Sequence, residues 1–295
     1  MTTGTPHLTG TGVWSGELRY GDPAHAADSA AELEALGFSA LWVPDVGGDV
    51  FGAVGTLLAA TSTVTVATGI LNIWMHPAGD TATAHEALIG EHGDRFLVGL
   101  GVSHAPLIDR VFDAGRYQRP LAVMAGYLDG LDQAPTPLAA AHRVIAALGP
   151  KMLDLARRRS GGVHPYLVTP EHTAAARAAV GPQSWVGPEQ AVVFSTDAGA
   201  ARTAARRHLA TYVGLPNYVN NWLRLGFTDA DVADGGSDRL VDALVAWGTD
   251  EAIAARLQAH RDAGADHVCV QVLTTAAADA AELRAGWRRL ADLAR

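Results

Sequence analysis

The sequence predicts a (β/α)8 TIM barrel, an α/β fold in which eight parallel strands alternate with helices. Apolar runs of strand length recur along the 295 residues, separated by helix-like segments. These runs are continuously apolar, which is typical of strands covered on both faces. A helix–Gly–strand pattern at 30–43 also returns at 260–272, and its glycines, Gly37 and Gly264, suit a helix end. We expect one domain over 1–295, and a doubly wound open sheet is the alternative.

Eight strands are expected, in chain order. They are 12–14, 40–43, 64–68, 96–100, 143–147, 163–166, 191–195 and 268–273. Start signals for helices lie between them. Asp22 and Thr169 each precede a proline, as a capping residue does, and Thr249 precedes two acidic residues that suit a helix dipole.

The segment 212–248 is an insertion between the seventh and eighth strands. Thr228 to Asp231 resembles a capping box, so the insertion is expected to be helical. Its apolar side chains would cover the barrel mouth as a lid, fill a small core of their own, or make a dimer contact: Pro216, Tyr218, Trp222, Leu223 and Phe227.

Composition excludes several classes of function. The 22 Lys and Arg against 31 Asp and Glu give a net charge of −9, which disfavours nucleic-acid binding. The uncharged stretch 52–75 is long enough to span a bilayer, but its Thr-Ser-Thr interruption indicates a helix end, a turn and a strand. With no visible signal peptide, a cytoplasmic protein without a membrane segment is expected.

Sequence motifs for other chemistries are missing. The single cysteine, Cys269, cannot form an internal disulfide, and no His-x-His or HExxH motif predicts a metal. His85 and Glu86 are expected on a solvated helix face. No GxSxG, Walker A or GxGxxG motif occurs either.

Polar residues and glycines follow the strands, where barrel enzymes place their working residues. Asp45 follows the second strand, and the third and fourth strands lead to His76 and His104. After the fifth strand, Gly149 and Pro150 open a helix whose free N–H groups could bind an anion.

Four segments, GILNIWMHPA, GDRFLVGLGVSHAP, VIAALGPKMLDLA and GGVHPYLVTPEHT, resemble the bacterial luciferase-like superfamily. More narrowly, they are similar to its oxidoreductases that use the deazaflavin coenzyme F420. The resemblance covers nearly the whole chain, through YVGLPNYVNNWLRLGF to AGADHVCVQV. It implies a TIM barrel that holds a planar cofactor ring at the carboxyl ends of its strands and transfers a hydride to or from a small organic substrate.

The resemblance also implies cofactor-binding residues. A bulge with a non-prolyl cis peptide would support the ring at Gly69, Ile70 and Leu71, with Asn72 beside it. Gly101, Val102 and Ser103 would line the ring or its ribityl-like chain, and Tyr166 and Trp74 would wall the pocket. The phosphate would lie near Ala147, Gly149, Pro150, Gly162, Val163 and His164, with Lys151 adding charge.

The catalytic candidates are Asp45, His104 and His76. Asp45 matches an acidic position near the polar edge of the ring, although Pro-Asp also suits a loop cap. His104 is favoured over His76 as proton donor, since His76 precedes a proline and would cap a helix. The alternative for His104 is packing against its own loop. Relatives often carry a catalytic His where this chain has Val46.

Three other functions stay open. The same fold could use FMN and oxygen as a monooxygenase, bind a flavin or deazaflavin without turnover, or be an unrelated barrel hydrolase. The expected partner is a small-molecule substrate, and relatives suggest a homodimer.

Overall fold

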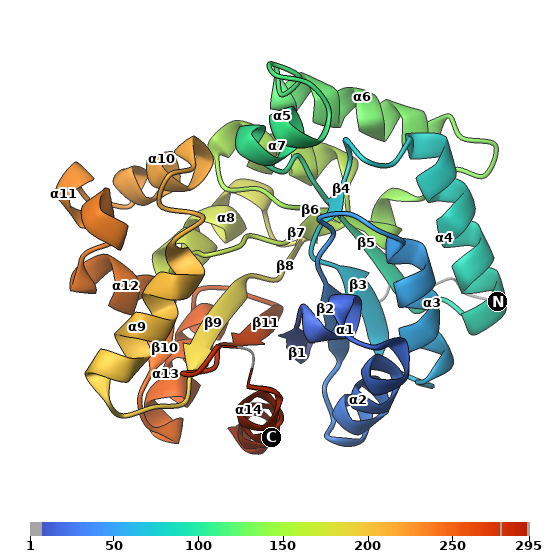
Figure 1. Ribbon diagram of the computed structural model, residues 1–295. Helices are drawn as coiled ribbons and strands as arrows, with labels where there is room; N and C mark the ends of the chain where they lie inside the picture. Colours follow the sequence, from blue (N-terminus) through green and yellow to red (C-terminus); the bar gives the residue numbers. More distant parts are fainter. Residues whose placement is uncertain (1–7, 278, 294–295) are drawn as a thin grey trace.

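The computed structural model describes residues 8–277 and 279–293 as a curved sheet of parallel strands with helices around it (Figure 1). Hydrogen-bonded neighbours follow the order β10–β9–β11–β1–β2–β3–β5–β6–β7–β8, and β4 pairs with β5. The strands are β1 (Gly10–Trp14), β2 (Ala40–Val43), β3 (Thr65–Thr68), β4 (Leu71–Asn72), β5 (Phe96–Gly101), β6 (Arg143–Ile145), β7 (Gly162–Val163), β8 (Trp185–Val186), β9 (Glu189–Val193), β10 (Val245–Trp247) and β11 (His267–Val272).

Helices connect successive strands and cover the outside of the sheet (Figure 1). They are α1 (Glu17–Tyr20), α2 (Pro23–Ala35), α3 (Val50–Ala59), α4 (Ala78–His92), α5 (Ala105–Val111), α6 (Pro120–Asp132), α7 (Pro150–Arg159), α8 (Pro170–Val180), α9 (Ala198–Leu209), α10 (Pro216–Arg224), α11 (Asp229–Val232), α12 (Asp238–Leu244), α13 (Asp250–Asp262) and α14 (Ala280–Leu293). None of the described helices is long and apolar enough to cross a membrane.

Strands β8 and β9 close the barrel as one strand that is interrupted at Gly187 and Pro188. On one side, the N–H of Glu189 donates to the carbonyl of Pro165 at 2.8 Å. On the other side, the N–H of Cys269 donates to the carbonyl of Pro188 at 2.9 Å. Because proline has no N–H, one hydrogen bond between the strands is missing at Pro188, but the strands stay paired on both sides of it. The eight-stranded (β/α)8 barrel is therefore confirmed over the doubly wound sheet.

Each of the eight expected strands overlaps an observed one, with ends that differ by a few residues. The sequence did not predict β4, β8 and β10. Strand β10 lies inside the segment expected to be helical and has only three residues. Strand β8 is two residues long and precedes Gly187 and Pro188, which look like a turn.

Bulky side chains fill the barrel at the amino ends of its strands. The buried cluster there consists of Leu8, Ala40, Trp42, Ala67, Leu97, Val144 and Cys269, with Trp14 and Trp185 packed against it. Strand residues two apart share a face, and further along the strands of Ala67 and Leu97 the inward positions are Gly69, Gly99 and Gly101. An added Cβ would be 2.7 Å from Nε1 of Trp14 at Gly69, 2.0 Å from the carbonyl oxygen of Thr68 at Gly99, and 2.4 Å from Cγ1 of Ile70 at Gly101. The absent side chains therefore let neighbouring segments pack closely at this level of the barrel.

The insertion between α9 and α13 packs with β9 and α9 in a second apolar cluster, separate from the main core. Trp222 is fully buried in this second cluster, and its Nε1 donates to the carbonyl of Leu167 at 3.2 Å. Thr228 and Asp231 form the predicted capping box at the start of α11. The insertion is thus helical, as expected, apart from β10.

Two local expectations are wrong. His85 does not lie on a solvated face of α4: its side chain is buried against β5, where Nε2 donates to the carbonyl of Phe96 at 3.2 Å. Burial lowers the pKa of His85 to about 4. Thr169 occupies the N-cap of α8, but its side chain makes no cap hydrogen bond. Asp22 and Thr249 do cap their helices.

Candidate functional site

A cavity of about 810 Å³ opens at the carboxyl ends of the barrel strands. This volume lies within the usual range for small-molecule and cofactor sites. Most of the residues singled out from the sequence line it: Asp45, Gly69, Ile70, Gly101, Val102, Ser103, His104, Ala147, Gly149, Pro150, His164 and Tyr166. These residues follow five different strands, β2, β3, β5, β6 and β7, and converge on one space.

Six residues with an expected role at the site do not line this cavity: Leu71, Asn72, Trp74, His76, Gly162 and Val163. Leu71 and Val163 are buried in the main apolar core, because strand residues alternate between the two faces. Gly162 lies so close to β8 that an added Cβ would be 2.1 Å from the carbonyl oxygen of Trp185. Its absent side chain thus permits strand packing instead of ligand approach.

The cavity wall formed by Gly69 and Ile70 is tightly packed. The peptide between them is cis, as the resemblance implies. The carbonyl of Gly69 accepts a 2.8 Å hydrogen bond from Nε1 of Trp14, which fixes this segment to β1. Ile70 lies against Gly101, where an added Cβ would be 2.4 Å from Cγ1 of Ile70. Two glycines thus make room for one apolar surface that a planar ring can contact.

Asp45 is a buried carboxylate held by three donors. Its Oδ2 accepts from the N–H of Asn72 at 3.0 Å and from Nε2 of His76 at 2.9 Å. Its Oδ1 accepts from the N–H of Gly47 at 3.3 Å. His76 therefore lies behind Asp45, packed edge-on against Phe51, and orients the carboxylate without lining the cavity.

His104 lies on another wall between two tyrosines. The rings of Tyr212 and Tyr218 meet it edge-on, with centroids 6.3 and 6.1 Å away. Burial lowers the pKa of His104, so its imidazole is neutral near pH 7. Its Nδ1 is buried and has no hydrogen-bond partner among the described residues. A neutral imidazole with a free nitrogen can exchange a hydrogen bond with a ligand in this cavity.

Tyrosine hydroxyls supply the other polar groups of the wall. The Tyr166 hydroxyl donates to Oε1 of Gln271 at 2.7 Å, and burial raises the pKa of Tyr166 well above its usual value. The Tyr117 hydroxyl donates to the carbonyl of Ser103 at 3.3 Å, and burial raises the pKa of Tyr117 to about 12. Both hydroxyls therefore stay protonated at neutral pH.

One end of the cavity is basic. Gly149 is the N-cap of α7, whose first N–H groups are free of helical partners, and Lys151 follows in the first turn. Arg224, at the end of α10, also lines this end, with Nη2 3.7 Å from the place of an added Cβ on Gly149. Two cations beside a helix N-terminus form a favourable environment for an anionic group such as a phosphate.

The insertion contributes residues that the sequence did not single out. Besides Arg224, the cavity is lined by Tyr212, Asn217 and Asn220 of the insertion, and also by Tyr218, which was named for a possible lid. The insertion thus lines the mouth of the cavity and also packs against β9 and α9 in the second apolar cluster. The only sequence signal for Arg224 was that it is a basic residue within the aromatic stretch 212–227. Its distance along the chain from the other site residues concealed its place in the cavity.

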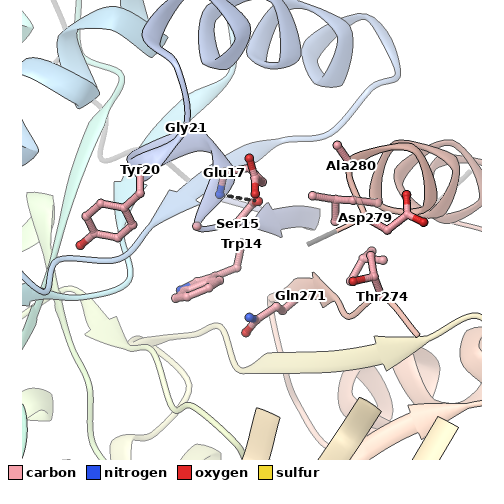
Figure 2. A pocket seen from close by; sticks show the side chains of 12 residues that line it. Trp14, Ser15, Glu17, Tyr20, Gly21, Gln271, Thr274, Asp279 and Ala280 are labelled. Carbon is pink, nitrogen blue, oxygen red and sulfur yellow. Dashed lines mark hydrogen bonds between the residues drawn. The ribbon is translucent and has the colours of Figure 1, made fainter. Parts of the chain in front are cut away.

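A second, smaller pocket of about 300 Å³ adjoins the cavity, and the two share Trp14, Gly16 and Tyr20. In Figure 2 the Trp14 indole and the Gln271 side chain lie on one side of this pocket, with Thr274 and Asp279 on the other. Gln271 also accepts the Tyr166 bond, so one amide connects the walls of both spaces.

Within residues 8–277 and 279–293, no group of three His, Cys, Asp or Glu side chains is arranged to hold a metal ion.

Comparisons with solved structures reproduce the fold over nearly the whole chain. An F420-dependent secondary alcohol dehydrogenase in complex with an F420–acetone adduct is 15% identical, with a TM-score of 0.74 over 97% of this chain and 98% of that one. The coenzyme F420 dependent tetrahydromethanopterin reductase from Methanopyrus kandleri is 16% identical, with a TM-score of 0.74 over 96% and 97%. The FMN complex of the oxygenating constituent of 3,6-diketocamphane monooxygenase, from Pseudomonas putida, is 12% identical, with a TM-score of 0.66 over 97% and 96%.

A comparison with curated proteins finds no match. The family model described as luciferase-like monooxygenase matches residues 1–267, which is most of the chain. The fold, the bulge and this match agree, and the chain belongs to the luciferase-like monooxygenase family.

Proposed function

We propose that this protein is an oxidoreductase that binds coenzyme F420 in the 810 Å³ cavity and transfers a hydride between the deazaflavin ring and a small organic substrate. The observation that carries the proposal is the combination of an apolar wall at Gly69 and Ile70 with a basic end at Lys151 and Arg224 in one cavity. A cofactor made of a planar ring and a phosphate-bearing chain would match both features: its ring would contact the apolar wall, and its phosphate would lie at the basic end.

The residues present fit such a cofactor. Gly69, Ile70 and Val102 would contact the planar ring, and the α7 N-terminus with Arg224 would hold the phosphate. Two buried nitrogens of cavity-lining residues, Nδ1 of His104 and Nε2 of His164, have no partner among the described residues and would gain hydrogen bonds from a ligand. The bound deazaflavin would supply the site for hydride transfer, which no side chain of the protein can supply.

The protein groups would then position the substrate and handle its proton. His104 is neutral and faces the cavity, so it can give a proton to, or take one from, an oxygen of the substrate. Asp45, held by His76, would orient a polar group from the opposite wall. The tyrosines around His104 would exclude water. Val46 is exposed and has no ionisable group, so it takes no part in the proton transfer.

The alternative is an FMN-dependent monooxygenase. A flavin shares the flat ring and the phosphate, and the structural neighbour from Pseudomonas putida is an FMN complex. Absorbance titration of the purified protein with F420 and with FMN, followed by a screen for ring oxidation with small carbonyl compounds, tests the proposal. Binding and oxidation of reduced F420 would support it. Binding of FMN but not F420 would favour the monooxygenase, and binding without turnover would favour a carrier.

A further inference from the structure

His164 is a buried histidine whose ring is fixed in one orientation. It follows β7, and its side chain points into the barrel, where it stacks on Trp42 with the ring centroids 4.2 Å apart and the planes 17° apart. Its Nδ1 lies 2.8 Å from the carbonyl oxygen of Gly187. A carbonyl oxygen only accepts hydrogen bonds, so Nδ1 carries the proton and Nε2 carries a lone pair. The stacking and this bond together decide where that lone pair points.

The Nε2 of His164 has no hydrogen-bond partner among the described residues, although its ring is almost fully buried. Burial lowers the pKa of His164 to about 4, so the ring stays neutral and Nε2 stays an acceptor at pH 7. The indole N–H of Trp14, which also lies beside Gly69, is used by the carbonyl of Gly69. An unsatisfied buried acceptor is costly, and native proteins rarely keep one without a reason.

The position of Nε2 shows which ligand would satisfy it. An added Cβ on Gly69 would be 3.2 Å from this nitrogen, and both residues line the cavity. Gly69 belongs to the wall assigned to the cofactor ring, whereas the basic end is formed by Lys151 and Arg224. A neutral lone pair would also repel a phosphate oxygen. The phosphate role that the resemblance gave to His164 is therefore not supported by this geometry.

We propose that Nε2 of His164 accepts a hydrogen bond from an N–H or O–H on the edge of the planar redox ring and so selects the ring's position. This inference rests on the proposed function. Both candidate rings carry an imide N–H, and the deazaflavin of F420 carries a ring hydroxyl as well. A dimethyl-substituted flavin edge offers no donor at that second position.

Other buried histidines provide a contrast. His267 also lies near Trp42, but its Nε2 accepts from the Trp42 indole at 3.3 Å, and its Nδ1 lies 3.4 Å from Ser39 Oγ. His260 pairs with Thr173 through Nδ1 and with Gln190 through Nε2. Both ring nitrogens of each of these histidines already have a hydrogen-bond partner within the protein, so neither histidine is assigned a role in ligand binding.

Two variants distinguish the loss of the hydrogen-bond acceptor at Nε2 from damage to the fold. In H164N the amide nitrogen can still donate to Gly187, but no atom reaches the place of Nε2. In H164Q a side-chain oxygen can reach that place. We expect H164N to bind F420 about five- to a hundredfold more weakly than the wild type, since a ring donor is left unpaired. H164Q should stay within about threefold of the wild type, and H267Q serves as the matched control with unchanged affinity.

Nitrogen-15 NMR of histidine-labelled protein gives a readout that needs no turnover. The Nε2 resonance of His164, assigned by its absence in H164N, should shift when the ring is added, while that of His267 should not. A loss of affinity for F420 alone would assign the hydroxyl as donor, and a loss for F420 and FMN alike would assign the imide.

Equal affinities for H164N and the wild type, with an unmoved Nε2 resonance, would overturn the inference and leave the proposed function intact. Failure of the wild type to bind either ring would instead overturn both.

Discussion

Glu189 gives the most quantitative prediction, because it is a carboxyl group sealed inside the barrel. Its side chain is fully buried; Oε2 accepts from the N–H of Leu167 at 3.1 Å, and Oε1 has no partner among the described residues. Burial raises the pKa of Glu189 to about 8, against an ordinary value of 4.5. The group is therefore a neutral acid in the folded protein near pH 7.

The sign of the pH effect follows from proton binding. Between pH 4.5 and 8 the folded state holds a proton on Glu189 that the unfolded state releases, so this residue makes the folded state less stable as the pH rises. Glutamine at 189 keeps an acceptor for Leu167 but cannot ionise. The free energy of unfolding of E189Q relative to wild type should therefore increase by about 2 kcal/mol from pH 6 to pH 8.

Urea unfolding followed by tryptophan fluorescence at several pH values measures this difference. Buried histidines, whose lowered pKa values oppose the effect below pH 6.5, are the same in both proteins and cancel. Glu86, exposed on α4, provides the matched control, and E86Q should keep a constant difference from wild type. A difference for E189Q that does not change with pH would refute the assignment of a neutral buried acid.

Three further outcomes are expected. G69A should bind the cofactor at least tenfold more weakly, because the added Cβ would be 2.7 Å from an indole nitrogen, whereas G79A, in open space on α4, should bind normally in the same titration. R224A should weaken binding of a phosphate-bearing ring about tenfold at low salt and flatten its salt dependence, as measured by titration at two ionic strengths. H76A removes a donor from the buried carboxylate of Asp45 and should lower the free energy of unfolding, measured with urea, by about 1–3 kcal/mol. A urea midpoint equal to that of the wild type would contradict the hydrogen bond between His76 and Asp45.

The fold could be predicted from the sequence because its signals are local. Continuous apolar runs marked the strands, and Gly37 and Gly264 have the left-handed φ of 93° and 96° that their place after a helix required. Strand β10 was missed, since three apolar residues after a helix look like the end of that helix. Its pairing with β9 depends on contacts far away in the sequence.

The site could be predicted only in part, for a similar reason. Glycines and polar residues after strands indicated the cavity wall, because the carboxyl ends of parallel strands meet at one rim. His76 orients Asp45 and does not line the cavity. This depends on the direction of its side chain in an irregular loop, which the sequence does not record. Arg224 reaches the mouth from an insertion about seventy residues away from Gly149, and no local pattern records that approach.

The central claim is that a planar redox ring lies against the Gly69–Ile70 wall with its phosphate at the basic end. A crystal structure of the protein soaked with F420 tests this most directly. We predict ring density on that wall, beside Nε2 of His164, and phosphate density between Arg224 and the start of α7. A ring bound elsewhere, or a cavity that stays empty at saturating F420 and FMN, would contradict it.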